Sequence, residues 1–180
     1  NRQRTTNSLN LEHNTSYVEV LDNANLRLSS GGSVGVWVKP SSNISSNGST
    51  ILNKGAAGDR NPRLTIETNK TLNFFWEDES TGDNENTIAG ALTTDVWTYI
   101  VCTWDGTTNK IYYNDALDDS ESESGTPAVG TIASSLFIGK DPTDADGHFQ
   151  GEIDDLVFYS DVLELAEVKR NYNAGKRSHR

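Results

Sequence analysis

Short apolar runs separated by polar turns follow one another along almost the whole chain, a pattern that is typical of β-strands. The clearest run covers residues 33–39, where valine occupies every second position and Pro40 ends the strand, because proline cannot donate to a sheet. Residues 63–68 and 71–77 flank a short turn and predict a hairpin. Residues 96–104 are apolar on both faces, which is typical of a central strand. The other predicted strands cover residues 8–12, 17–20, 50–54, 110–114, 136–140 and 152–159.

One helix is predicted near the C-terminus, where Leu165, Val168 and Tyr172 fall on a single stripe and Gly175 provides a C-cap. A helix this short is not stable alone, so we expect it to pack on the strands. The acidic stretches 78–85 and 118–125 are interpreted as surface loops. Many strands and one helix predict an all-β fold, a two-sheet antiparallel jelly-roll sandwich with one short C-terminal helix.

The length of 180 residues fits one domain. We place that domain at residues 8–174, between a basic extension at residues 1–7 and a basic tail at residues 175–180. No apolar run approaches the roughly 18 residues of a membrane-spanning helix, so we expect no membrane insertion. The single cysteine, Cys102, excludes a disulfide framework and a multi-cysteine zinc site.

The charge is distributed unevenly along the chain, whose net charge is −11. All 26 acidic residues lie between residues 12 and 167, whereas seven of the 15 basic residues lie outside that range, near the two ends. An acidic body repels nucleic acid and anionic membranes, which excludes both as partners. The basic ends are either solvated or a handle that docks onto an acidic protein partner. The candidate docking residues are Arg2, Arg4, Lys176, Arg177 and Arg180.

Several segments share one family's sequence pattern. Residues 97–106 read Trp-Thr-Tyr-Ile-Val-Cys-Thr-Trp-Asp-Gly, residues 110–114 read Lys-Ile-Tyr-Tyr-Asn, and residues 149–159 contain Gly-Glu-Ile-Asp-Asp. With residues 8–11, 17–20, 34–40, 51–55 and 136–139, they resemble laminin-G-like, concanavalin A-like modules of the lectin–glucanase superfamily. Asp115 departs from the family, which usually has glycine there. Residues 170–179 are similar to the tails of such modules in structural proteins of marine tailed phages.

The resemblance implies a jelly roll and, in many relatives, a structural Ca²⁺. Here the ion would be held by Asp154 and by backbone carbonyls around His13 and Asn14. The alternative is that Asp154 satisfies buried backbone N–H groups. A second candidate ligand-binding set is the loop with Asp141, Asp144 and Asp146, which is otherwise a plain acidic surface loop.

Enzymatic chemistry is not expected. Glycosidases of this fold carry their acids on one strand, and Glu152 and Asp154 begin that motif, but Leu156 and Val157 stand where the further acid is required. Cys102 has no basic neighbour in the sequence to activate its thiol.

Two functions remain open. The first is a non-catalytic structural or interaction module on a phage virion surface, a decoration or fibre protein with protein partners. The alternative is a secreted or cell-surface carbohydrate-binding module with glycan partners, so the expected location is a virion surface or extracellular. The four tryptophans are expected in the core. The candidates for an exposed, sugar-stacking platform are Phe75, Tyr99, Tyr112 and Tyr113.

Overall fold

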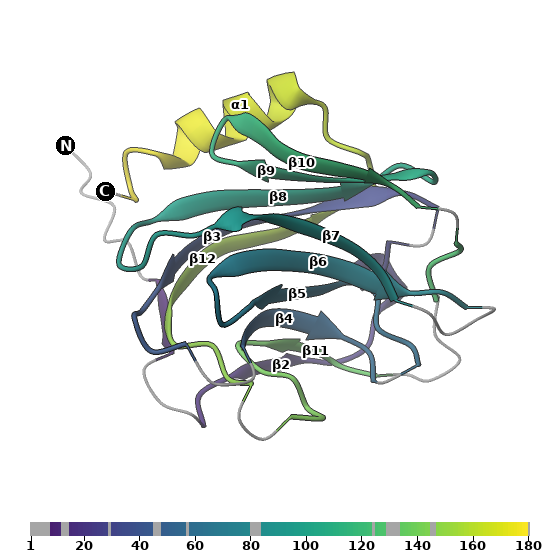
Figure 1. Cartoon of the computed structure of the whole chain (residues 1–180), viewed down its shortest axis with the longest axis horizontal. Helices are drawn as coiled ribbons and strands as arrows, with labels where there is room; N and C mark the ends of the chain where they lie inside the picture. The colour runs from purple at the N-terminus through teal and green to yellow at the C-terminus, as the bar shows by residue number, and fades with distance from the viewer. Residues whose placement is uncertain are drawn as a thin grey trace.

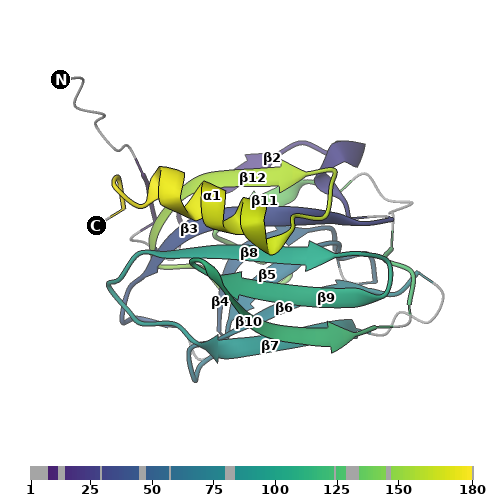
Figure 2. The same ribbon diagram turned by 90° about the horizontal axis from the view of Figure 1, so that it is seen from above.

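The computed structural model describes residues 8–11, 15–28, 30–44, 48–56, 58–79, 84–123, 125–128, 134–144 and 147–179, with the backbone alone at residues 84–86. Two six-stranded antiparallel sheets pack face to face, and one helix, α1 (Leu165–Gly175), lies against the outer face of one of them (Figures 1 and 2). We name that one the helix-side sheet and the other the second sheet.

The helix-side sheet has the strand order β1 (Leu9–Leu11), β12 (Gly151–Tyr159), β3 (Gly32–Pro40), β8 (Thr98–Trp104), β9 (Thr108–Tyr113) and β10 (Ala116–Ser122). The second sheet has the order β2 (Val18–Val20), β11 (Leu136–Ile138), β4 (Ser49–Lys54), β5 (Arg63–Ile66), β6 (Thr71–Glu77) and β7 (Asn84–Ala91). A short 3₁₀ helix, η1, covers Ala24–Leu26. The predicted all-β sandwich with a C-terminal helix is confirmed.

Side chains on the two faces of the central strands β3 and β8 pack into two separate apolar clusters. Between the sheets lie Val34, Val36 and Val38 of β3 together with alternate residues of β8, among them Ile100. The opposite face of the helix-side sheet is covered by α1. The cluster there contains Trp37, Tyr99, Val101, Tyr112, Leu163 and Val168. Residues 96–104 were predicted to form a central strand that is apolar on both faces, and β8 confirms this for residues 98–104. Val96 precedes the strand and is 49% exposed.

The interpretation of residues 118–125 as a loop is wrong, because residues 116–122 form the edge strand β10. Its polar sequence is compatible with a strand because β10 pairs with β9 on one side only and is largely exposed. Asn114 takes the left-handed conformation, with φ 58°, in the connecting turn, so glycine is not needed at Asp115. The predicted C-terminal boundary of the other loop, residues 78–85, is also wrong, since β7 begins at Asn84.

Helix α1 begins with a capping box between Glu164 and Glu167. Of the predicted stripe, Val168 is fully buried and Tyr172 stacks on Trp37. The helix ends at Gly175, where a Cβ would lie 2.5 Å from the indole nitrogen of Trp37. The glycine therefore allows the helix end to rest directly on the sheet. No helix among the described residues is long and apolar enough to cross a membrane.

Candidate functional site

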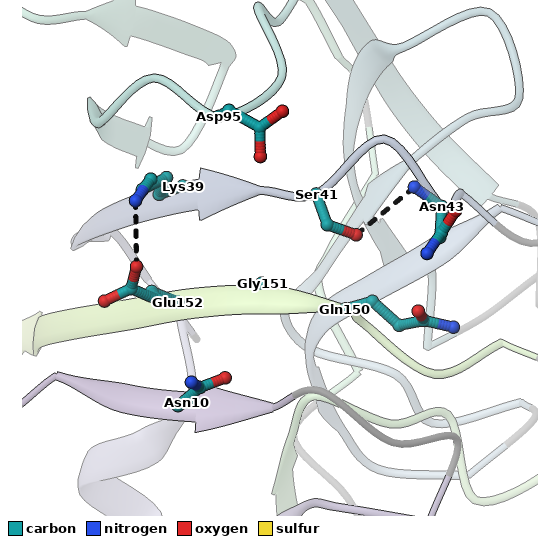
Figure 3. A pocket seen from close by; sticks show the side chains of 8 residues that line it. All are labelled: Asn10, Lys39, Ser41, Asn43, Asp95, Gln150, Gly151 and Glu152. Atoms are coloured by element: carbon teal, nitrogen blue, oxygen red, sulfur yellow. Dashed lines mark hydrogen bonds and ion pairs between the residues drawn. The ribbon is translucent and has the colours of Figure 1, made fainter.

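An open pocket of about 290 Å³ lies on the outer face of the helix-side sheet, where β3 ends and β12 begins (Figure 3). Lys39 and Glu152 belong to this face because their strand neighbours Val38 and Ile153 point into the core. The described lining residues are Asn10, Lys39, Ser41, Asn43, Asp95, Gln150, Gly151 and Glu152. Apart from the glycine, every one of them carries a polar side chain.

Gly151 lies in the middle of the pocket, with Asp95 and Asn10 on opposite sides of it in Figure 3. Its φ of +142° favours glycine, and a Cβ at this position would overlap the carbonyl oxygen of Lys39. The glycine therefore allows β12 to pass close to the end of β3.

The charged groups of the pocket are held in place. The Glu152 carboxylate accepts hydrogen bonds from Ser8 Oγ at 2.6 Å and from Lys39 Nζ at 3.0 Å. These bonds, the one from Ser8 first, hold the pKa of Glu152 below its usual range, so this carboxylate stays ionised. The amide of Asp95 donates to Pro40 O at 2.8 Å, which ties the loop before β8 to the end of β3. The pocket is thus preformed.

Asp154 lies further along the same face of β12, opposite Trp37. Its Oδ2 atom is 3.0 Å from Nε2 of His179, and its Oδ1 atom accepts from the amide of Asp155 at 2.9 Å. The His179 ring stacks on Trp37, with centroids 4.2 Å apart, and meets Trp97 edge-on. Sequence reasoning missed His179, because 25 residues separate it from Asp154 and no motif connects the two.

Only part of the predicted calcium site lies among the described residues. Calcium takes six to eight oxygen ligands, whereas the groups that meet Asp154 are an imidazole and the carboxylate of Asp155. The last residue of β1, Leu11, pairs with Gly151, three residues before Asp154 in β12. His13 and Asn14 lie outside the described residues. Calcium at these residues stays a prediction.

Asp141 is 1% exposed and lies in the loop that follows β11. Its carboxylate accepts from the amide and hydroxyl of Thr143 and lies 3.0 Å from Nη2 of Arg63. Asp144 donates its amide to the carbonyl of Asp141, and Asp146 lies outside the described residues. Since Asp141 is engaged by protein groups, it fixes its own loop. A ligand-binding role for the three acids stays a prediction.

The basic tail is described in part. Lys176 and Arg177 are exposed, and the Lys176 ammonium lies 4.9 Å from the centre of the Tyr172 ring. Arg2, Arg4 and Arg180 lie outside the described residues. Docking by this set of residues stays a prediction.

The expected aromatic platform is wrong for three of its four members, because Phe75, Tyr99 and Tyr112 are at most 5% exposed. Tyr99 and Tyr112 belong to the cluster under α1, so the helix replaces solvent on that face. Tyr113 is half-buried, and its hydroxyl donates to Gly90 O. Cys102 is fully buried, and burial raises the pKa of its thiol well above the usual value, which opposes thiolate chemistry.

The sequence model of the family described as the Concanavalin A-like lectin/glucanases superfamily matches residues 12–169. No curated protein sequence matches the chain.

Several solved structures share the fold. The CBM40 module of the Ruminococcus gnavus IT-sialidase, bound to α2,3-sialyllactose, superposes with a TM-score of 0.73 at 16% identity, covering 92% of this chain and 95% of that one. Domain 4 of an extracellular arabinanase from Geobacillus stearothermophilus, in complex with arabinotriose, gives 0.69 at 20% identity, covering 91% and 75%. The receptor binding domain of botulinum neurotoxin D gives 0.71 at 19% identity, covering 94% of this chain but 46% of that one.

Proposed function

We propose that this chain, which belongs to the concanavalin A-like lectin/glucanase superfamily, is a non-catalytic binding module for carbohydrate. The bound sugar lies in the pocket around Gly151 on the outer face of the helix-side sheet. The module acts outside the cell, where glycans of cell surfaces and matrices are met.

The composition of the pocket carries this proposal. Each sugar hydroxyl both donates and accepts hydrogen bonds, so a sugar site needs donors and acceptors side by side. Carboxamide, carboxylate, hydroxyl and ammonium groups surround Gly151, and sheet contacts hold several of them in place. A volume of about 290 Å³ is near the lower end of the roughly 300–1,000 Å³ of small-molecule sites, which suits one or two sugar units.

Two of the similar structures hold oligosaccharides, sialyllactose in one and arabinotriose in the other, and this supports the class of ligand. A general-acid role for Glu152 is opposed by its lowered pKa, which keeps the carboxylate ionised. The described lining residues include no aromatic ring on which a sugar could stack. We therefore expect weak binding, with a Kd of about 1 mM, which corresponds to roughly −4 kcal/mol.

An array of immobilised oligosaccharides, followed by calorimetric titration of the strongest hit, tests the proposal. The double variant Asp95→Asn and Asn43→Ala replaces one exposed carboxylate of the pocket with a neutral carboxamide and removes one exposed carboxamide. Asparagine keeps the left-handed backbone that Asp95 adopts, with φ 60°, so the loop is preserved. We expect at least a tenfold loss of affinity. The matched control, Asp115→Asn in the β9–β10 turn, keeps wild-type affinity. An array without hits, or a double variant that binds like the control, contradicts the proposal.

The virion-surface role remains a second candidate. It rests on the exposed Lys176 and Arg177 in a chain whose net charge is −11. Co-sedimentation of the wild type with phage shells, lost on Lys176→Ala and Arg177→Ala substitution, would favour this role over glycan binding.

A further inference from the structure

We propose that Asp154, Asp155 and His179 form a binding site for a divalent transition-metal ion such as Zn²⁺ or Ni²⁺, and that the ion fastens residues 176–179 to the helix-side sheet. The three ligand atoms lie within 4.8 Å of one another. This site is separate from the sugar pocket, and the inference does not depend on the proposed function.

The spacing of the His179 and Asp154 ligand atoms fits one ion, and the Asp155 carboxylate lies within 4.8 Å of both. His179 Nε2 and Asp154 Oδ2 are 3.0 Å apart. Two ligand atoms bound at about 2.1 Å to one tetrahedral ion lie roughly 3.4 Å apart, so a small outward shift admits the metal. One imidazole and two carboxylates form a mixed nitrogen and oxygen set, which favours a borderline transition metal over calcium or magnesium.

The hydrogen bonds of the His179 ring leave Nε2 facing an acceptor. Its Nδ1 atom is 3.0 Å from the carbonyl oxygen of Gly175, and a carbonyl only accepts, so Nδ1 carries a proton. In the neutral ring Nε2 then holds a lone pair, which points at the Asp154 carboxylate, a second acceptor. A proton on Nε2 would make the pair a plain ion pair, and a divalent cation between the two atoms would take the place of that proton. A backbone carbonyl on the far nitrogen is also the arrangement that orients metal-binding histidines.

A bulge in β12 brings the second carboxylate to the same place. Consecutive strand residues normally point to opposite faces of a sheet. The register of β12 shifts between Asp154 and Val157, and Asp155 takes a left-handed φ of 47°. Bulges of this kind re-aim side chains. Two adjacent acids therefore share one face of the strand and meet His179.

The site is rigid on one side and open on the other. The His179 ring is 6% exposed and is held by Trp37 and Trp97. Asp155 is exposed and borders a hollow of about 220 Å³ that Ser178 also lines. An ion can enter from this hollow, and water can complete its coordination.

Calorimetry and thermal unfolding of the EDTA-treated, tag-free chain test the site with ZnCl₂, NiCl₂ and CaCl₂. We expect one Zn²⁺ per chain, a Tm rise of several degrees with Zn²⁺ or Ni²⁺, and no response to Ca²⁺. Asp155→Asn, which changes an exposed side chain, should weaken Zn²⁺ binding at least tenfold, and His179→Gln should do the same. The control Asp161→Asn, an exposed acid nearby in the sequence, should bind like the wild type. Absence of Zn²⁺ binding at 1 mM metal, or equal binding in Asp155→Asn and the control, overturns the site and leaves a plain ion pair.

Tryptic cleavage after Lys176 and Arg177 tests the fastening of the segment. Both residues are exposed, and they lie between α1 and His179. We expect Zn²⁺ to slow cleavage there at least fivefold in the wild type and not in Asp155→Asn. Equal cleavage rates with and without Zn²⁺ in the wild type would overturn the fastening.

Discussion

The carboxylate of Asp141 lies in a dense polar contact on the outer side of the second sheet. Burial raises the pKa of Asp141, but the hydrogen bonds from Thr143, followed by the charges of Arg63 and Arg60, outweigh it and hold the pKa below its usual range. The same contacts that lower the pKa tie the loop after β11 to strand β5, which carries Arg63. Asp141 is therefore a structural anchor whose effect depends on pH.

We expect Asp141→Asn to lower the free energy of unfolding by about 3 kcal/mol at pH 7, because the change leaves Arg63 half-paired in a buried place. The pKa of Asp141 is lower in the folded state than its usual value of 3.8. Its contribution is therefore complete above that value and is lost as the pH falls through the folded-state pKa. Urea unfolding from pH 7 to pH 2.5 should show the gap between wild type and variant closing in acid. The exposed control Asp115→Asn should show no such gap, and a gap that persists at low pH would contradict the assignment.

At the scale of elements, α1 is stable because the helix-side sheet covers Val168 and Tyr172 of its apolar stripe, whereas Leu165 is 38% exposed. Val168 is fully buried in the cluster with Trp37 and Val101. Removing two methyl groups there leaves a cavity, so Val168→Ala should cost about 2 kcal/mol of unfolding free energy. Guanidinium unfolding measures this, and Lys169→Ala, on the exposed side of the same turn, should change stability by less than about 0.5 kcal/mol. Equal effects of the two variants would show that the helix does not pack as described.

The sequence predicts the elements whose apolar period is clear. The valines of β3 and the two-sided apolar run of β8 indicate buried strands from composition alone. Strand β10 could not be predicted in this way. An exposed edge strand needs no apolar face, and the acidic sequence of β10 is typical of a surface loop. The Asp154 cluster is only partly predictable. Asp154 is visible as a motif, but its partner His179 and the bulge at Asp155 depend on contacts between distant segments.

At the scale of the whole molecule, the outer face of the helix-side sheet has two covered parts and one open part. Helix α1 covers Tyr99, Val101 and Tyr112, the segment with His179 covers Trp37, and the end of β3 and start of β12 are left open as the polar pocket. The helix thus explains why Tyr99 and Tyr112 of the predicted aromatic platform are buried. A ligand of this face must bind by hydrogen bonds.

Cys102 reports on the opening of the whole sandwich. It lies in β8 with its side chain in the core between the sheets, 0% exposed, and burial raises the pKa of its thiol. Both sheets must separate before a reagent reaches it, because β8 is central in its sheet and paired on both sides. We expect iodoacetamide at pH 8 to label the native chain on the order of 1,000-fold more slowly than the urea-unfolded chain, as global opening requires. The labelling rate should rise with urea in parallel with the loss of the circular dichroism signal. Val168→Ala should raise the labelling rate only as far as it lowers the free energy of global unfolding. If Cys102 is labelled faster than the chain unfolds, β8 becomes exposed through a local opening of the helix-side sheet, and the expectation is contradicted.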